Sequence, residues 1–180
     1  MLNDKLIGID VGTTSVKAAV LDQSGTVHSS FVESYQTKRT GDTIVEQNPE
    51  DWVRLIDKAL SSLGLDQVAA IGLCSQVNTH VFVDADGNAL CPAILWKDRR
   101  ASGEATALDA QITVAQKEAW WGAPMPIDAS HVISRMAWVA KYRPDIWDKT
   151  RWVMLPKDYC ILKLTGKVST DPLSNIGLVD

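Results

Sequence analysis

The sequence predicts an α/β fold, in which a mixed β-sheet opens with an antiparallel three-strand meander and is flanked by helices. Three observations predict this fold. Residues 6–35 contain apolar or β-branched runs separated by turn residues, as consecutive antiparallel strands do. Residues 49–63 have the apolar spacing of an amphipathic helix. The continuous apolar run at 68–74 is typical of a central strand that is buried on both faces.

The first hairpin is the most informative stretch of the chain. Residues 6–9 and 16–20 are predicted strands, and residues 10–15 form the tip between them. Gly12 supplies the backbone freedom that a sharp reversal needs. The tip offers backbone N–H groups that no bulky side chain covers, together with three hydroxyls, and such a concavity can hold phosphate oxygens. The hydroxyls come from Thr13, Thr14 and Ser15.

Asp10 stands between the first strand and this turn. A carboxylate beside a phosphate is unfavourable on its own, but a hard divalent cation between them prefers oxygen ligands. We therefore expect Asp10 to face Mg²⁺. A plain glycine-containing hairpin stays an open alternative, because short glycine motifs often match by chance. The GxxxxGK[ST] and GxGxxG nucleotide patterns are absent from the sequence.

Length and composition limit the class of protein. The 180 residues suit about one domain, and 46% hydrophobic with 22% charged residues is ordinary for a globular protein. The net charge of −4 argues against a nucleic-acid surface. No apolar run reaches the roughly 20 residues that span a bilayer, and the first residues do not resemble a signal peptide. We expect a cytoplasmic protein with no membrane partner.

The cysteines and histidines do not form a recognisable metal or disulfide pattern. The three cysteines are widely spaced, without CxxC pairs, and we expect them to be reduced and partly buried. The three histidines form no HExxH or related set, so we expect no zinc site.

Residues 22–75 continue the predicted sheet. Residues 22–25 form a turn, 26–35 a third strand and 37–47 a polar loop. Asn48 caps the helix that follows, Pro49 suits its first position, and Gly64 ends it.

Polar residues follow the strand at 68–74. Strand ends that face a crevice are common ligand sites in α/β sheets, so Gln76, Asn78 and His80 are candidate binding residues. A plain polar turn is the alternative. Residues 80–84 are a further predicted strand, and the DG pair in residues 84–88 indicates a turn.

The segment PAILWKDRR at residues 92–100 joins an apolar run to charged residues. Trp96 can stack on a sugar ring or pack in the core. Asp98, Arg99 and Arg100 can bind hydroxyls, pair with one another or lie in solvent, and the sequence leaves these alternatives open.

Helices dominate the rest of the chain. The first two helices that we expect lie at 102–110 and from a Thr113–Gln116 capping box to Trp120. A third begins after its cap, Ser130, and ends before Pro144. Residues 144–149 form either a helix or a turn, and residues 156–165 form the last helix. Residues 152–155 are a short apolar segment. The many tryptophans are most simply explained as core residues.

The motifs IGIDVGTTSVKAAVLD, QVN, PAILWKDRR and LPKDYCILKLTG, in this order, resemble the amino-terminal domain of FGGY-family carbohydrate kinases, most closely the xylulokinase-like branch. The resemblance runs along essentially the whole chain. It implies a ribonuclease-H-like/actin-like ATPase fold. It also implies that the γ-phosphoryl group of ATP, with Mg²⁺, is transferred to a sugar or polyol hydroxyl, a ketopentose such as xylulose being the expected substrate.

The resemblance also assigns residues. Asp10 matches the acidic residue that organises metal and phosphate, and is the one expected catalytic residue in the chain. Trp96 and Asp98 match a WxD that borders the sugar pocket. The expected phosphate-binding residues are Gly12, Thr13, Thr14, Ser15 and Lys17. The expected sugar-binding residues are Gln76, Val77, Asn78, Trp96 and Asp98.

One pair departs from the family pattern. Val77 and Asn78 stand where xylulokinases carry Met-His and glycerol kinases carry Arg-Glu. Asn78 can donate and accept hydrogen bonds but, unlike histidine, cannot become charged. The resemblance therefore leaves the identity of the sugar open.

Two family features are missing from residues 1–180: the second actin-like domain with the adenosine site, and the GGGDN-like segment whose aspartate is the general base. The chain therefore resembles a truncated amino-terminal domain, with negligible kinase activity alone and the carboxyl-terminal domain as its partner. A homodimer stays open. The alternatives are a non-catalytic sugar-binding or regulatory remnant of a kinase, and another actin-like ATPase such as a chaperone nucleotide domain.

Overall fold

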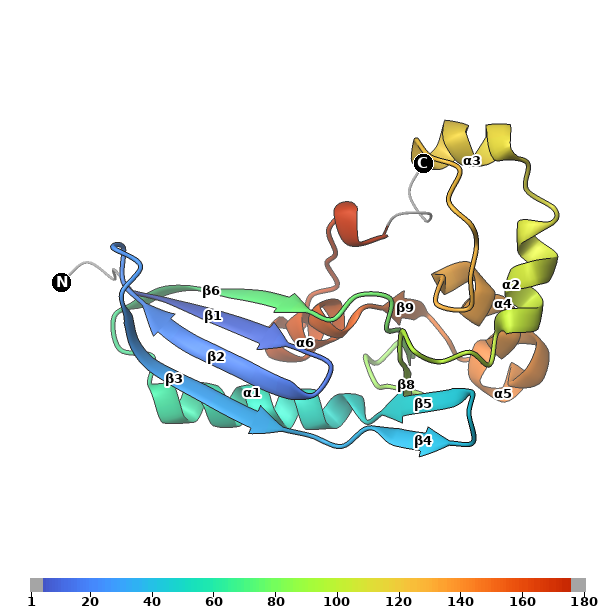
Figure 1. Ribbon diagram of the computed structural model, residues 1–180. Helices are drawn as coiled ribbons and strands as arrows, with labels where there is room; N and C mark the ends of the chain where they lie inside the picture. Colours follow the sequence, from blue (N-terminus) through green and yellow to red (C-terminus); the bar gives the residue numbers. More distant parts are fainter. Residues whose placement is uncertain (1–4, 176–180) are drawn as a thin grey trace.

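The computed structural model describes residues 5–175, and its central element is a mixed four-stranded sheet (Figure 1). The strand order is β3-β2-β1-β6. The first three strands pair antiparallel, whereas β6 runs parallel to β1, which confirms the predicted meander and mixed sheet. The bounds are β1 Lys5–Val11, β2 Ser15–Leu21, β3 Val27–Ser34 and β6 Val68–Ser75.

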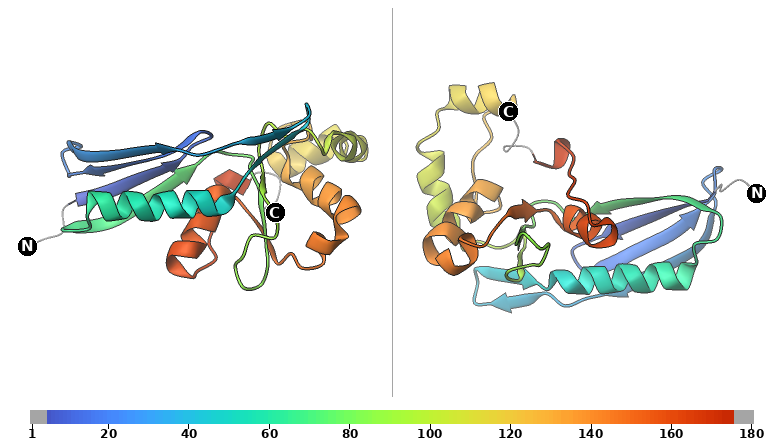
Figure 2. Two further views of the ribbon diagram at one scale, coloured as in Figure 1. Left: turned by 90° about the horizontal axis from the view of Figure 1, so that it is seen from below. Right: turned by 180° about the vertical axis from the view of Figure 1, so that it is seen from behind.

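Two helices, α1 (Pro49–Leu63) and α6 (Pro156–Thr165), pack on the same face of this sheet (Figure 2). The inward side chains of β1 and β2 are buried there against Trp52 of α1, which is fully buried. The predicted α1 is confirmed: the Asn48 side chain accepts a 3.2 Å hydrogen bond from the N–H of Glu50. Gly64, with φ of 75°, ends the helix in a conformation that favours glycine.

The opposite, outer face of the sheet carries no helix within residues 5–175. Its side chains are small or exposed, and Leu6 and Val32 keep 46% and 65% of their surface in solvent. The expectation that residues 68–74 form a central strand buried on both faces is therefore wrong. Strand β6 lies at the edge of the sheet, and much of it is exposed because no described element pairs with its free side or covers its outer face.

A second region beside the sheet is built from short strands. The prediction of a loop at 37–47 is wrong, because this segment forms a β-hairpin around Gly41 in which Val45 is buried. The apolar pair in the hairpin was too short to reveal the strand from periodicity. The bounds are β4 Lys38–Thr40, β5 Ile44–Gln47 and β8 Ala93–Ile94 in one sheet, and β7 Val81–Val83 with β9 Trp152–Met154 in another.

Four helices and one 3₁₀ turn complete the described chain: α2 Ser102–Asp109, α3 Val114–Trp121, α4 Val132–Tyr142, α5 Pro144–Trp147 and η1 Leu173–Asn175. The predicted capping box at Thr113 is confirmed. The N-cap of α4 is His131 rather than Ser130, because Ser130 bonds instead to the Asp128 carboxylate. Core placement was wrong for Trp96 and Trp120, which are 43% and 55% exposed. None of the helices described is long and apolar enough to cross a membrane.

Candidate functional site

The turn between β1 and β2 is held from outside by Tyr35. The Tyr35 hydroxyl donates to the Gly12 carbonyl, and the Tyr35 N–H donates to the Thr14 carbonyl at 3.2 Å. Within residues 5–175, the N–H groups of Thr13 and Thr14 have no acceptor. Two free amides in a fixed turn are what a phosphate-binding concavity needs.

Gly12 lies where a side chain would fit only tightly, and its backbone is not left-handed. Its φ is not positive, so the predicted role in backbone freedom is not the one that the structure gives it. A Cβ at this position would lie 3.3 Å from the Ser15 carbonyl oxygen and 3.5 Å from Asp10 Oδ2. The Asp10 carboxylate therefore folds back beside the turn, close to the predicted phosphate position.

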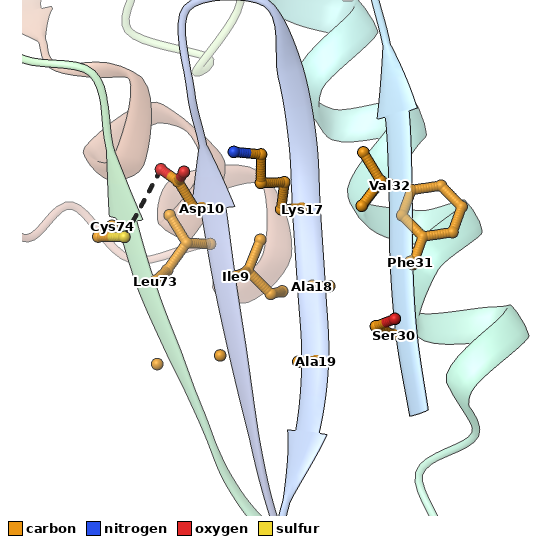
Figure 3. A pocket seen from close by; sticks show the side chains of 12 residues that line it. Ile9, Asp10, Lys17, Ala18, Ala19, Ser30, Phe31, Val32, Leu73 and Cys74 are labelled. Carbon is orange, nitrogen blue, oxygen red and sulfur yellow. Dashed lines mark hydrogen bonds between the residues drawn. The ribbon is translucent and has the colours of Figure 1, made fainter. Parts of the chain in front are cut away.

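Asp10, Lys17 and Cys74 lie next to one another on the outer face of the sheet (Figure 3). They line a hollow of about 520 Å³ whose other walls are largely apolar. The Cys74 thiol lies 3.7 Å from Asp10 Oδ1, and burial together with the Asp10 charge raises the pKa of this thiol. Cys74 is exposed, not partly buried as predicted. Lys17 has no ion-pair partner in the described part of the chain.

The groups around Asp10 are compatible with Mg²⁺ that is held mainly by water and substrate phosphates. In the described chain, no three His, Cys, Asp or Glu side chains gather closely enough to hold a metal ion on their own. Mg²⁺ is commonly held by one or two carboxylates, with waters and substrate phosphates completing its shell. A single carboxylate beside a turn with free amides is compatible with that mode of binding.

A closed ring of hydrogen bonds joins the turn to the segment after β6. Gln47 Nε2 donates to the Thr13 carbonyl at 2.7 Å, and Gln47 Oε1 accepts from Gln76 Nε2 at 2.9 Å. Gln76 Oε1 accepts from the Thr79 hydroxyl at 3.2 Å, and the Thr79 hydroxyl accepts from the Trp96 N–H at 3.3 Å. The Trp96 indole closes the ring by donating to the Thr13 hydroxyl at 3.3 Å. We call these five residues the polar ring.

Two adjoining hollows open beside the polar ring, and both contain Trp96 and Ser130. The smaller, of about 350 Å³, is lined by Thr13, Gln76, Val77, Asn78, Trp96 and Ser130. The larger, of about 520 Å³, extends past Asp98, Arg99 and Asp128 toward α2. An exposed indole beside hydroxyl and amide groups can bind a polyhydroxylated molecule, because the ring packs on C–H faces while the polar groups bond to hydroxyls.

Asp98 has a structural role at this site, because it links the segment at 98–100 to strand β5. It is buried, and its oxygens accept hydrogen bonds from the Val45 N–H at 2.7 Å and from Arg100 at 2.7 to 2.9 Å. Arg100 also pairs with Glu46 at 2.8 Å. Of the alternatives left by the sequence, pairing is therefore the one that Asp98 and Arg100 adopt. Both Asp98 oxygens are already committed to protein donors.

The structure brings together residues that sequence reasoning missed. Gln47 and Thr79 belong to the polar ring, and the Asn78 amide donates to Ser130 at 3.3 Å. Arg135 lies on the buried stripe of α4 between Val132 and Val139. A basic residue on an apolar helical stripe was the one signal that could have identified it.

Comparison with known proteins agrees with the fold and the motifs. A sequence model described as "FGGY family of carbohydrate kinases, N-terminal domain" matches residues 5–178. Xylulose kinase of Escherichia coli (strain K12) is 35% identical over an alignment of 169 positions, which covers 92% of this chain and 34% of that protein. Xylulose kinase of Staphylococcus xylosus is 30% identical over an alignment of 184 positions, which covers 97% of this chain and 36% of that protein.

Solved structures agree on the fold. A ligand-bound xylulose kinase from Lactobacillus acidophilus superposes with a TM-score of 0.85 at 24% identity, over 96% of this chain and 36% of that one. The architecture is thus the actin-like ATPase fold. The chain spans about a third of the length of the curated relatives it matches. By its sequence and its fold, the chain belongs to the FGGY family of carbohydrate kinases, whose N-terminal domain it matches.

Proposed function

We propose that this chain forms the sugar-side half of an ATP-dependent kinase, in which the γ-phosphoryl group of ATP is transferred to a hydroxyl of a sugar or polyol. The observation that carries the proposal is the polar ring. It joins Thr13 of the expected phosphate turn to Gln76 and Trp96 of the expected sugar site. The phosphoryl donor and the sugar hydroxyl that accepts the phosphoryl group would therefore meet at one hollow.

Phosphoryl transfer depends mainly on positioning and on neutralising charge. The free amides of Thr13 and Thr14 and the Lys17 ammonium would bind phosphate oxygens, and Asp10 would hold Mg²⁺, which supplies charge neutralisation when bound. The hydroxyl that receives the phosphoryl group would lie in the smaller hollow, next to Thr13. The two substrates would then share the wall that Thr13 forms.

The substrate that we propose is a ketopentose such as xylulose. The support is the similarity to two xylulose kinases. Asn78 presents an amide, which both donates and accepts hydrogen bonds, and Val77 is 62% exposed beside it. Neither residue is ionisable, so sugar recognition through this pair should not change with pH.

We further propose that the 180 residues alone have negligible kinase activity. The chain covers 34% of its Escherichia coli relative, and a general base contributes roughly 10²- to 10⁴-fold to a reaction rate. The resemblance assigns that base, and the adenosine site, to sequence beyond this chain. Kinase turnover by the purified chain at ordinary enzymatic rates would contradict this proposal.

The decisive experiment reads the natural frame past Asp180 and assays the protein that it encodes. ADP release is followed with a panel of ketopentoses, aldopentoses and glycerol, with and without Mg²⁺. We expect Mg²⁺-dependent turnover that is fastest with a ketopentose. Turnover with none of these acceptors, together with no sugar binding by calorimetry, would reject the proposal. Binding without turnover would favour the regulatory remnant, which the altered Val77-Asn78 pair also suggests.

A further inference from the structure

Arg135 is a fully buried cation on α4, directly behind the candidate sugar site. Its guanidinium donates to three backbone carbonyls and contacts one imidazole. The carbonyls belong to Asn78, to Ile94 at 2.9 Å and to Leu95, and the imidazole nitrogen is His80 Nδ1 at 2.7 Å. Arg135 therefore binds two segments that are far apart in the sequence, 78–80 and 94–95.

The partners of Arg135 are unusual for a buried charge. No carboxylate in the described chain forms an ion pair with it, since the Asp98 oxygens are taken by Arg100 and Val45. Burial lowers the pKa of the Arg135 guanidinium to about 9, so the side chain is charged at neutral pH. Burying a charge among neutral acceptors is costly, and an apolar side chain would fill the same space at lower cost.

His80 is fixed by the same contact. A guanidinium has no acceptor, so His80 Nδ1 can only accept here, and it shares the two Nη1 hydrogens with the Asn78 and Ile94 carbonyls. The ring proton of His80 then lies on Nε2. Burial, together with the Arg135 charge, lowers the pKa of His80 well below 6.5. The imidazole is therefore neutral, and it acts as one more acceptor in the set that surrounds Arg135.

The two bound segments carry the residues that face the hollow. Asn78 has a φ of 50°, a conformation that is uncommon outside glycine, and Arg135 binds its carbonyl. Trp96 directly follows the Leu95 carbonyl that Arg135 also binds. A reciprocal pair of 3.0 Å backbone hydrogen bonds between His80 and Ile94 joins the segments at their middle.

We propose that Arg135 is a positioning residue for sugar binding: it holds segments 78–80 and 94–95 together so that Asn78 and Trp96 face one sugar in the smaller hollow. The inference rests on the proposed function, because it assumes that the hollow binds the sugar. Arg135 does not line that hollow itself. Its effect would reach the sugar through the backbone of Asn78 and through Trp96.

Three variants test this role in the protein encoded by the complete reading frame. Arg135→Met removes the charge and all donors at similar length, whereas Arg135→Lys keeps the charge but not the planar fork. Lys141→Met is the matched control, since Lys141 lies on the same helix, its side chain is 61% exposed, and its ion-pair partner is Glu104 of α2 rather than a residue of either segment. The readouts are the KM for sugar, the KM for ATP, kcat, and amide hydrogen exchange of segments 78–80 and 94–96. If the frame encodes no second domain, the sugar Kd from calorimetry replaces the kinetic constants.

We expect Arg135→Met to raise the sugar KM by about tenfold or more, because small misplacements of binding groups have large effects. The KM for ATP should stay near the wild-type value, and exchange should rise in the two segments alone. Arg135→Lys should fall between wild type and Arg135→Met, and Lys141→Met should match wild type.

Other outcomes overturn the inference. An unchanged sugar KM in a folded Arg135→Met or Arg135→Lys protein removes the positioning role. If amide hydrogen exchange rises throughout the protein and both KM values and kcat worsen equally, Arg135 contributes to stability alone. Failure of both variants to fold leads to the same conclusion. If only Arg135→Met fails to fold, the sugar KM of Arg135→Lys tests the positioning role: a raised value supports it and an unchanged value removes it. A wild-type protein that neither binds nor phosphorylates a sugar contradicts the proposed function instead.

Discussion

The two halves of the candidate site differ in what satisfies their polar groups. On the sugar side, Gln47, Gln76 and Thr79 bond to one another and to backbone groups, and they are buried. On the phosphate side, Lys17 has no ion-pair partner in the described residues, and Asp10 contacts one weak donor, the Cys74 thiol. The sugar side is thus organised before a ligand arrives, whereas the groups on the phosphate side are available to one.

The same contrast divides the two faces of the sheet. The inner face is closed by α1 and α6, but the outer face, which carries Asp10 and Lys17, keeps an apolar hollow open to solvent. A soluble domain usually covers an apolar sheet face. Because this uncovered face lies beside Asp10, we propose that the further sequence to which we assign the adenosine site packs on this side.

Replacing Asp10 with alanine should break the phosphate half while leaving the sugar half intact. In the complete kinase we expect kcat to fall by about 10²- to 10³-fold, because a group that organises charge in the transition state is lost. Sugar affinity, measured by calorimetry, should stay within about twofold, since the polar ring does not include Asp10. Asp57→Ala, at an exposed carboxylate on α1, is the control. Normal turnover in Asp10→Ala would reject the catalytic role.

Paired leucine substitutions compare the two faces directly. Leu55→Ala removes a fully buried side chain from α1 and should cost about 2–5 kcal/mol of unfolding free energy. Leu6→Ala, on the outer face, should cost less than about 1 kcal/mol in the isolated chain. Urea unfolding of both variants measures this difference. A larger cost of Leu6→Ala in the longer protein would show that its outer face is covered there, and an equal cost would argue that it is not.

Trp96 tests the sugar half. Trp96→Ala should raise the sugar KM by about fivefold, because aromatic stacking contributes roughly 1 kcal/mol. Trp96→Phe keeps a ring but loses the indole donor to Thr13, so its effect should be smaller. Trp120→Ala removes an equally exposed indole on α3 and serves as the control. The same KM in all three variants would exclude Trp96 from the sugar site.

The smallest expected effect is a pH dependence of stability. The pKa of His80 in the folded protein is well below 6.5, its value in an unfolded chain, so the unfolded state binds more protons as the pH falls. Stability should therefore fall as the pH drops below 6.5, and recover as the pH rises. His131, whose pKa is also lowered by burial, adds to the slope. Urea midpoints of wild type and His80→Gln check this, and equal slopes would contradict the assignment.

Local signals in the sequence were sufficient for much of the fold. The capping of α1 and α3, the meander and the turn at residues 84–88 follow from short-range chemistry, and the structure confirms them. The exposure of β6 could not be predicted, because an apolar sequence indicates that a strand can be buried but does not show which elements pack beside it. The hairpin at 38–47 was missed because its strands are short and largely polar.

The residues of the candidate site also differ in whether local sequence signals could identify them. Residues at the ends of elements, such as Asp10, Gln76 and Trp96, could be named because they follow apolar runs. Gln47, Thr79 and Arg135 could not, since their importance comes from partners that lie 17 to 57 residues away. Asp98 was named from the charged run at 98–100 and from the WxD resemblance, but only the structure shows that its oxygens accept hydrogen bonds from Arg100 and the Val45 N–H.

The free side of β6 has a practical consequence for handling the protein. Residues Val68–Ser75 contain no charged side chain, and no strand within residues 5–175 pairs with the backbone groups along their free side. Such an edge is a template for another strand and favours self-association. Purified by itself, the chain should therefore form concentration-dependent aggregates, and a lysine in place of Ala70 should keep it monodisperse.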